Sequence, residues 1–333
     1  MKILIVPDSF KGSLTSAEVC ECIRGGILAT DNTHEITTLP FADGGEGFAD
    51  CMRNICNGDI LYSNCHDIYG KPMRGQIVTF GKTAVIDCAT ASGLQAKKNV
   101  MRASSFGTGE LIKSAVSSGF HDIILGLGGS GCCDGGAGIL AALGGDFYDI
   151  NYRKIAVPNG SDLNDIYGIG FRNIVKDINF TFACDVTNEY CGKNGAAYVF
   201  APQKGANQTQ VEELDEGLKR LAAFLPKDIT ALSGGGAAGG ICGGLYAVYG
   251  GTVRSGFDIL SEYAHLEQLI QECDIVVTGE GKTDEQTLMG KLPFKIREIA
   301  RRYHKRFVLV SGRIEIDNFA DKSISIRSEE RRV

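Results

Sequence analysis

The sequence predicts an α/β protein of two domains, one of them a flavodoxin- or Rossmann-like parallel sheet built from both ends of the chain. The chain has 333 residues, enough for one very large domain or two of ordinary size. Short apolar strands followed by glycines and then by a helical pattern recur along it, as in parallel α/β layers. The first strand and the last two share this character. We therefore expect the middle of the chain to form a second, mixed α/β domain that is inserted into the first.

The boundaries of these domains are placed where the pattern of apolar strands, glycines and helices along the sequence changes. We place the Rossmann-like domain at residues 1–60 plus 258–333 and the inserted domain at residues 61–257. In the first part, the strand KILIV leads into a helix over 16–30 with Ser16 as the expected N-cap. The stretch 75–91 predicts two strands of a hairpin that turns at 80–83.

The remaining elements follow the same patterns. The run DIILG at 122–126 predicts a buried strand that leads through glycines into a helix over 137–143. A strand is expected at 179–186, and apolar residues at helical spacing predict an amphipathic helix over 210–225. Near the end, a strand at 274–280, a helix at 291–303 and a strand at 306–312 complete the first domain.

Composition excludes several classes of function. The net charge of −6 gives no general attraction to nucleic acid or to an anionic membrane. No apolar run approaches the roughly 20 residues of a membrane span. The twelve cysteines contain no C-x-x-C pair, and a chain of this length needs no disulfides, so we expect reduced, structural cysteines in a cytoplasmic protein.

Five loops combine glycine with polar or acidic residues. They are residues 7–13, 41–48, 126–138, 233–244 and 278–287. Glycine lets backbone N–H groups approach a ligand closely, and such groups at helix starts form anion sites. Four of the loops also carry Asp or Glu, which would repel phosphate unless a divalent cation bridges them. The set therefore predicts a site for a metal–nucleotide complex.

One loop matches the dinucleotide fingerprint G-x-G-x-x-G at Gly126, Gly128 and Gly131. A Rossmann site also needs an acidic residue about 20 residues later, at the end of a second parallel strand. Asp146 or Asp149 could serve, although residues 140–154 give no clear second strand. An NAD-linked hydroxy-acid dehydrogenase is therefore the alternative function. The GEGKT run at 279–283 is not a P-loop, because residue 276 is valine where that motif needs glycine.

The catalytic base is expected to be a carboxylate. The sequence has no G-x-S-x-G, and its five histidines all lie outside the glycine loops. This pattern matches phosphoryl transfer to a hydroxyl, in which an Asp accepts the proton while Mg²⁺ and lysine balance the charge. Five lysines adjoin the loops and are candidates for phosphate or carboxylate contacts: Lys11, Lys193, Lys204, Lys282 and Lys291.

Eight segments together resemble the bacterial type I glycerate kinases. They are PDSFKGSLT, PFADGGEGF, CATASGL, FGTGELI, GLGGSGCCDGGAGILAALGG, ACDVTNEYCGKNGAAYVFAPQKGA, GGGAAGGICGGL and DIVVTGEGKTDEQTLMGK. They occur in the family's order over about 1–312, and the ordered set is highly specific. The resemblance implies ATP-dependent phosphorylation of D-glycerate to 2-phosphoglycerate. It also implies two α/β domains with the active site in the cleft between them.

Site residues are carried over from the matching motifs, and their roles are predictions within that set. Asp185 follows a strand end, where a side chain can point into a cleft, and we predict that it is the general base. The other predicted catalytic residues are Lys11 and Asp284. Substrate binding is assigned to Asp8, Ser9 and Lys11, and Mg²⁺ binding to Asp43, Glu46 and Glu280. Nucleotide phosphates are assigned to Gly128, Gly129, Ser130, Gly234, Gly235 and Gly236.

Two departures from the family pattern matter. Cys132 and Cys133 replace the usual Thr-Asn, which removes two hydrogen-bonding side chains from the third loop. If side chains hold the phosphate, affinity falls; if backbone N–H groups hold it, little changes. After Arg313 the chain is polar where the family continues with a further helix. A truncated, inactive nucleotide-binding relative is therefore a second alternative, and we expect a monomer or homodimer.

Overall fold

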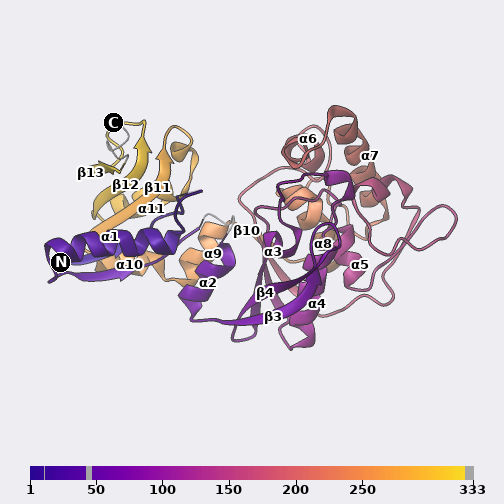
Figure 1. The fold of residues 1–333 in the computed structure, drawn as a ribbon, viewed down its shortest axis with the longest axis horizontal. Coiled ribbons are helices and arrows are strands. Elements are labelled where there is room, and N and C mark those ends of the chain that lie inside the picture. The colour runs from indigo at the N-terminus through magenta and orange to yellow at the C-terminus, as the bar shows by residue number, and fades with distance from the viewer. Residues whose placement is uncertain (11, 43–46, 327–333) are drawn as a thin grey trace. The chain divides into compact units, whose positions relative to one another are not determined.

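The structure is a computed structural model of the chain, and it describes residues 1–10, 12–42 and 47–326. Two compact units make up the chain (Figure 1). Unit 1 comprises Met1–Asp43, Asn54–Cys56 and Phe257–Val333; unit 2 comprises Gly44–Arg53 and Asn57–Gly256. One unit holds a parallel sheet and the other a mixed sheet, which confirms the predicted α/β class. The predicted domains, residues 1–60 with 258–333 and residues 61–257, stay predictions.

Strands and helices alternate along most of the chain. The strands are β1 Lys2–Ile5, β2 Glu35–Thr38, β3 Asp59–His66, β4 Pro72–Phe80, β5 Thr83–Asp87, β6 Asp122–Gly126, β7 Asp146–Tyr148, β8 Gly168–Gly170, β9 Asn179–Ala183, β10 Thr252–Arg254, β11 Ile275–Thr283, β12 Arg306–Ile314 and β13 Lys322–Ser325. The helices are α1 Ser16–Thr30, α2 Phe48–Cys56, α3 Cys88–Ser92, α4 Phe106–Ser117, α5 Ala137–Ala142, α6 Ala196–Phe200, α7 Gln208–Phe224, α8 Ile241–Tyr249, α9 Gly256–Tyr263, α10 Leu266–Glu272 and α11 Leu292–Arg302. Short 3₁₀ turns are η1 Val100–Arg102, η2 Gly160–Asp165, η3 Pro202–Lys204, η4 Ala237–Gly240 and η5 Thr287–Met289.

The sheet of unit 1 is parallel throughout and has the order β13-β12-β11-β1-β2. Numbered along this unit, that order is 2-1-3-4-5, the arrangement of flavodoxin-like folds. The order reverses between β1 and β11. Ligands of such sheets bind beyond the carboxyl ends of the strands at this switch point. Unit 1 therefore has a predictable place for a site, after Ile5 and toward the end of β11.

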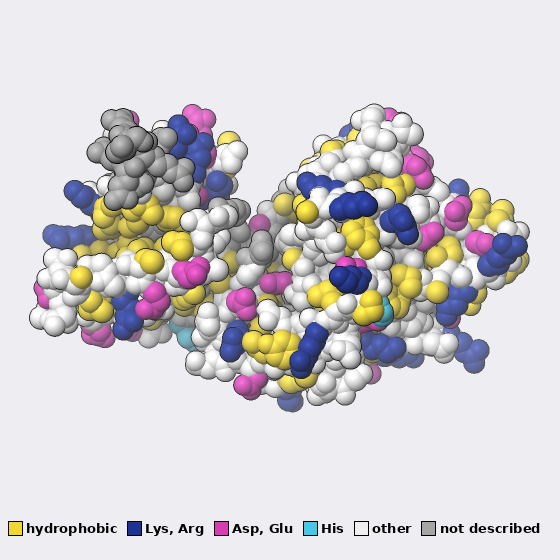
Figure 2. Space-filling view, in the orientation of Figure 1, with side chains coloured by type: hydrophobic (Ala, Val, Ile, Leu, Met, Phe, Trp, Pro, Cys, Tyr) yellow, Lys and Arg dark blue, Asp and Glu magenta, His cyan; other side chains and the backbone are white. Residues whose placement is uncertain are grey.

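Side chains from both faces of this sheet are buried. Ile3, Ile5 and Val277 pack with Cys20 of α1, which lies across one face (Figure 1). Because strand residues alternate in direction, Leu4 and Val276 point to the opposite face. On the α1 face burial is incomplete, since Val308 and Val310 of β12 are only partly buried there. Figure 2 shows hydrophobic side chains at the surface of this unit.

Helix α1 is capped one residue earlier than we predicted. Thr15, not Ser16, is the N-cap: its hydroxyl accepts the N–H of Glu18, whose carboxylate accepts the N–H of Thr15. Ser16 is used differently. Its hydroxyl donates to the Pro7 carbonyl at 2.7 Å and accepts the Phe41 N–H at 2.8 Å. The Ser16 side chain thus ties the segment that follows β1 to the segment that follows β2.

Unit 2 contains a six-stranded mixed sheet of order β10-β9-β6-β5-β4-β3. The strands β5, β6, β9 and β10 are parallel and lie in chain order, whereas β3 and β4 join antiparallel. The predicted hairpin is confirmed, with Phe80 opposite Thr83. The predicted amphipathic helix is also confirmed as α7, whose Val211, Leu214 and Leu218 are buried.

The twelve cysteines form no disulfide in this structure, and most of them are buried. Within residues 1–10, 12–42 and 47–326, no helix combines the length and apolar character needed to cross a bilayer.

Candidate active site

In unit 1 the predicted residues gather at the switch point of the sheet. The chain continues past β1 beside β11, with the Asp8 N–H donating to the Gly279 carbonyl at 2.8 Å. The Asp8 side chain is buried and accepts the N–H of Ser9 at 2.7 Å. Glu280 follows Gly279 directly. Asp8, Ser9 and Glu280 are thus placed at one edge of the sheet, while Lys11, Asp43 and Glu46 lie outside the described residues.

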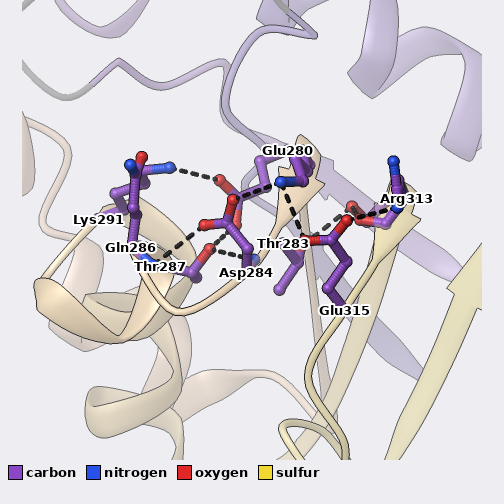
Figure 3. Close-up of polar contacts among 10 residues, drawn as sticks. Glu280, Thr283, Asp284, Gln286, Thr287, Lys291, Arg313 and Glu315 are labelled. Atoms are coloured by element: carbon purple, nitrogen blue, oxygen red, sulfur yellow. Dashed lines mark hydrogen bonds and ion pairs between the residues drawn. The ribbon is translucent and has the colours of Figure 1, made fainter.

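Glu280 is a buried carboxylate with few partners. Its Oε1 accepts the hydroxyl of Thr287 at 2.6 Å, and its Oε2 lies 3.8 Å from Nζ of Lys291, the N-cap of α11 (Figure 3). Burial raises the pKa of Glu280, and the hydrogen bond from Thr287 and the charge of Lys291 oppose that shift. A buried carboxylate with one distant cation has room for a further positive partner.

Asp284 lies in a network of ion pairs beside Glu280 (Figure 3). Lys282 Nζ is 2.9 Å from Asp284 Oδ2 and 2.9 Å from Glu315 Oε2, and Arg313 also pairs with Glu315 at 2.7 Å. The hydrogen bond from Lys282 lowers the pKa of Asp284. Asp284 is therefore an ionised, paired carboxylate in this structure.

The predicted magnesium ligands fit a hard cation in part. Carboxylate oxygens are the ligands that Mg²⁺ prefers, and Glu280 supplies a buried one. Asp43 and Glu46 are not described. In the part of the chain that is described, no three His, Cys, Asp or Glu side chains are grouped to hold a metal ion. Glu280 is therefore the one predicted ligand whose surroundings can be judged, and they suit a cation.

In unit 2 the candidate general base lies at the carboxyl edge of the parallel strands. Asp185 comes two residues after β9 and is exposed. Its Oδ1 accepts the hydroxyl of Ser255 at 2.8 Å, and its Oδ2 accepts the N–H of Gly256 at 3.3 Å. Ser255 follows β10, the neighbouring strand. Both carboxylate oxygens are therefore oriented by donors from one adjacent segment.

A second carboxylate at this edge was missed by the sequence analysis. Asp87 is the last residue of β5 and stands in register with Gly126 and, one strand further, Ala183. It accepts the Ala49 N–H at 3.2 Å. A Cβ on Gly126 would collide with Asp87 Oδ1, so this glycine makes room for the carboxylate. The available signal was an acid directly after an apolar strand, in AVID.

The loop after β6 presents backbone N–H groups. The carbonyl of Gly129 accepts the Leu94 N–H at 3.0 Å, and the Gly131 N–H donates to the Ser92 carbonyl at 2.8 Å. Gly128, Gly129 and Ser130 are at least partly exposed, and within the described chain their N–H groups have no protein acceptor. The loop is held by its neighbours while three consecutive donors are left for a ligand.

The buried side chain of Asp134 stabilises this loop through hydrogen bonds. It is fully buried, and Oδ2 accepts the N–H of Ser105 at 2.7 Å and the Ser105 hydroxyl at 2.8 Å. It also accepts the N–H groups of Gly136 and Gly138 at 3.1 and 3.3 Å. Burial raises the pKa of Asp134, against these hydrogen bonds. Asp134 organises the loop and does not face a ligand.

Cys132 and Cys133 point into the core. Both are fully buried members of the main hydrophobic cluster of unit 2. Burial raises the pKa of Cys133 to about 12 and also raises the pKa of Cys132 well above its usual value. Neither side chain is exposed to a ligand, so this loop offers backbone groups and Ser130 for binding.

The glycines at 234–236 are used for packing in this structure. All three are buried, and the N–H groups of Gly235 and Gly236 donate to the carbonyls of Leu232 and Asn188 at 2.9 and 3.0 Å. A Cβ on Gly236 would collide with the Glu189 carbonyl. Phosphate binding by Gly234, Gly235 and Gly236 stays a prediction, and two of the three donors are already engaged.

The dinucleotide fingerprint has no Rossmann context. The strand after α5 is β7, which pairs antiparallel with β8 in a separate two-stranded sheet and not with β6. Asp146 begins β7 and its Oδ1 lies 2.6 Å from Nζ of Lys154. Among its described residues, unit 2 therefore has no parallel strand that ends about 20 residues after the fingerprint, where the NAD alternative needs one. The structure describes all residues from 47 to 256.

Comparison with known proteins gives one family over nearly the whole chain. The model of the glycerate kinase family matches residues 3–328. Glycerate 2-kinase of Escherichia coli K12 is 39% identical over 329 residues, covering 95% of this chain and 86% of that protein. Glycerate kinase of Bacillus cereus is also 39% identical, over 94% of this chain and 86% of its own.

The fold comparison gives the same family. A crystal structure from Salmonella typhimurium LT2, provisionally assigned as glycerate kinase 2, superimposes with a TM-score of 0.86. It is 38% identical, and the match covers 98% of this chain and 90% of that one. With the flavodoxin-like sheet, the acidic switch point and the glycine loops in place, this chain belongs to the glycerate kinase family, whose members are phosphotransferases that phosphorylate glycerate.

Proposed function

We propose that this protein transfers the γ-phosphoryl group of ATP to the 2-hydroxyl of D-glycerate, giving 2-phosphoglycerate and ADP. Asp185 acts as the general base in this proposal. Its carboxylate accepts the proton of the substrate hydroxyl while that oxygen forms a bond to the γ-phosphorus and the bond to ADP breaks.

The orientation of Asp185 is the observation that carries the proposal. A general base must be fixed within hydrogen-bond reach of the proton it removes. The hydroxyl of Ser255 and the N–H of Gly256 each bind one oxygen of Asp185, at 2.8 and 3.3 Å. A carboxylate is an acceptor and can take up the proton of a substrate hydroxyl. No histidine is needed for this step.

The nucleotide side of the site is assigned to the loop after β6. The exposed N–H groups of Gly128, Gly129 and Ser130 suit the oxygens of a phosphate chain. Because this loop follows β6 and Asp185 follows β9, the parallel neighbour of β6, they lie along the same carboxyl edge. A phosphoryl donor bound at the loop thus shares that edge with the base.

Magnesium and the substrate carboxylate are assigned to unit 1. Glu280, with Asp43 and Glu46, would hold Mg²⁺, which when bound neutralises charge on the phosphate oxygens. Asp8 accepts the Ser9 N–H, and its carboxylate suits a glycerate hydroxyl, while Lys11 is assigned to the glycerate carboxylate. Asp284 is kept as a further predicted catalytic residue.

The direct test is ADP release by the purified protein in a coupled assay. The expected result is ADP release that requires both D-glycerate and Mg²⁺. Omission of either, or replacement of D-glycerate by 3-hydroxypropionate, which lacks the 2-hydroxyl, checks the requirement. Nucleotide binding without turnover of D-glycerate would instead identify an inactive relative and contradict the proposal.

A further inference from the structure

Lys204 of unit 2 is a buried cation to which the proposed reaction has given no role. It ends the 3₁₀ turn Pro202–Lys204 and is only 3% exposed. Its Nζ donates to the hydroxyl oxygen of Ser130 at 3.1 Å and to the carbonyl of Cys132 at 2.7 Å. Both partners are uncharged and both belong to the loop after β6.

The ammonium group of Lys204 makes no direct ion pair in the described part of the chain, although buried Asp134 belongs to the loop that it contacts. Across residues 1–10, 12–42 and 47–326, no carboxylate oxygen lies within 4.0 Å of its Nζ. An ammonium group has three N–H donors, and two of them are used. Burying a charge without a counter-charge is unfavourable, so buried lysines are normally paired. An anion bound at the loop that Lys204 contacts would supply a counter-charge near this group.

The loop next to Lys204 is suited to receive that anion. Its carbonyls bind protein donors, as the Leu94 N–H to the Gly129 oxygen shows, while the N–H groups of Gly128, Gly129 and Ser130 have no acceptor in the described chain. The positive charge of Lys204 and these three donors therefore adjoin the same short segment. Together they match the chemistry of a phosphate group more closely than that of a neutral ligand.

Ser130 connects the buried cation to the surface. Its hydroxyl oxygen accepts from Lys204, so its own O–H is left to donate to another group. Ser130 is partly exposed, whereas Lys204 is not. A charged donor strengthens the hydrogen bond that the receiving hydroxyl makes in turn. Lys204 can thus act on a ligand that it does not itself reach.

We propose that Lys204 is the positioning residue of the phosphate site: its charge orients the Ser130 hydroxyl toward a phosphate oxygen of the nucleotide and neutralises that oxygen. This inference rests on the proposed function for the identity of the nucleotide. It does not rest on turnover, because the same contact forms with any polyphosphate that fits the loop.

The test compares two substitutions that separate charge from hydrogen bonding. Lys204→Gln keeps an N–H donor but loses the charge. Lys204→Met loses both the donor and the charge in a side chain of similar length. Lys113→Met is the matched control, since Lys113 is an exposed lysine on α4 of the same unit. Titration calorimetry measures the Kd of Mg·ATP and of tripolyphosphate for each protein, and circular dichroism checks that each is folded.

Both Lys204 variants are expected to raise the two Kd values by about 10- to 100-fold, the range of a lost charge-assisted hydrogen bond. Lys113→Met leaves them unchanged. In the glycerate assay the KM for ATP rises with Kd, and the KM for glycerate does not. Ser130→Ala added to Lys204→Met causes no further loss, because the two residues act through one contact.

Two results overturn the inference. One is a Lys204→Gln protein that binds both ligands as the wild type does, which would make Lys204 a structural donor only. The other is a wild-type protein that binds neither ligand. Failure of the proposed function looks different: Mg·ATP and tripolyphosphate bind and respond to Lys204, yet D-glycerate is not phosphorylated.

Discussion

Ser255 donates its hydroxyl to Asp185 at 2.8 Å, across the ends of the neighbouring strands β9 and β10. The contact fixes one oxygen of an exposed carboxylate, and the N–H of Gly256 fixes the other at 3.3 Å. The position of Asp185 is thus set by backbone and side chain of one adjacent segment. The first two predictions follow from this relationship.

Asp185→Asn should lower kcat by about 10²- to 10⁴-fold, the usual contribution of a general base. The amide has nearly the same shape but cannot accept the substrate proton. The Kd of Mg·ATP should change little, which calorimetry on the same protein checks. A parallel loss of nucleotide affinity and rate would assign Asp185 to metal binding instead.

Ser255→Ala should lower kcat by about fivefold, because a net hydrogen bond contributes about 1 kcal/mol to holding the base in place. The KM for both substrates should stay unchanged. Thr252→Ala is the matched control, since Thr252 begins β10 and its hydroxyl pairs with Thr181 at the other end of the strands. Equal kinetic effects at 252 and 255 would show a general weakening of β10 and not a role for Ser255.

Glu280→Gln should raise the Mg²⁺ concentration needed for half-maximal activity by at least about tenfold, the loss typical even when a ligand's hydrogen-bond partner is removed. A buried carboxylate is exchanged for a neutral amide that still accepts from Thr287. Glu315→Gln is the control within the same cluster, where Glu315 pairs with Lys282 and Arg313. An unchanged Mg²⁺ requirement in Glu280→Gln would remove Glu280 from the metal site.

Cys133 should resist alkylation in the native protein. Burial raises its pKa to about 12, so the thiolate is roughly one part in 10⁴ at pH 8, and raising the pH from 7 to 9 still leaves it protonated. Cys22 is exposed and should react readily. Peptide mapping after iodoacetamide treatment measures both. Native Cys133 that reacts as fast as Cys22 would mean that the loop side chains are open to ligands.

A related substitution tests which part of the loop binds phosphate. Cys132→Thr introduces the residue usual in the family at a fully buried site. Because neither cysteine side chain faces a ligand, the KM for ATP should stay within about twofold of the wild type. A clear fall in KM would show that a side chain at 132 reaches the phosphate and that the backbone is not sufficient.

The sequence predicted elements whose pattern is local. Apolar runs followed by glycine and a helical face predicted β1 and β6, an apolar run predicted β9, and apolar residues at helical spacing predicted α7. The hairpin that turns at 80–83 followed from two short strands around Gly81. For the parallel sheet, the sequence predicted only that strands from both ends of the chain form it, and not the order of the strands. Its 2-1-3-4-5 arrangement depends on contacts between residues 1–38 and 275–325, which no local pattern encodes.

Site residues were harder to predict because a local sequence pattern does not reveal whether a side chain or an N–H group faces a ligand or the protein interior. Asp134 and Glu280 both lie in glycine-rich loops. Asp134 is enclosed by four hydrogen-bond donors, two of them from Ser105, whereas Glu280 is approached by the hydroxyls of Thr287 and Thr283 and by one distant ammonium group. Gly235 and Gly236 looked like ligand-binding glycines, but their N–H groups bind protein carbonyls. Asp87 was missed because its role depends on Gly126, which is far from it in sequence.

The central claim is phosphoryl transfer from ATP to the 2-hydroxyl of glycerate, and phosphorus NMR of the reaction mixture tests it most directly. Purified protein is incubated with D-glycerate, ATP and Mg²⁺, without enzymes that interconvert phosphoglycerates. The account predicts equal growth of the 2-phosphoglycerate and ADP resonances. A 3-phosphoglycerate resonance would contradict the assigned hydroxyl, and ATP left intact beside unmodified glycerate would contradict the proposed function as a whole.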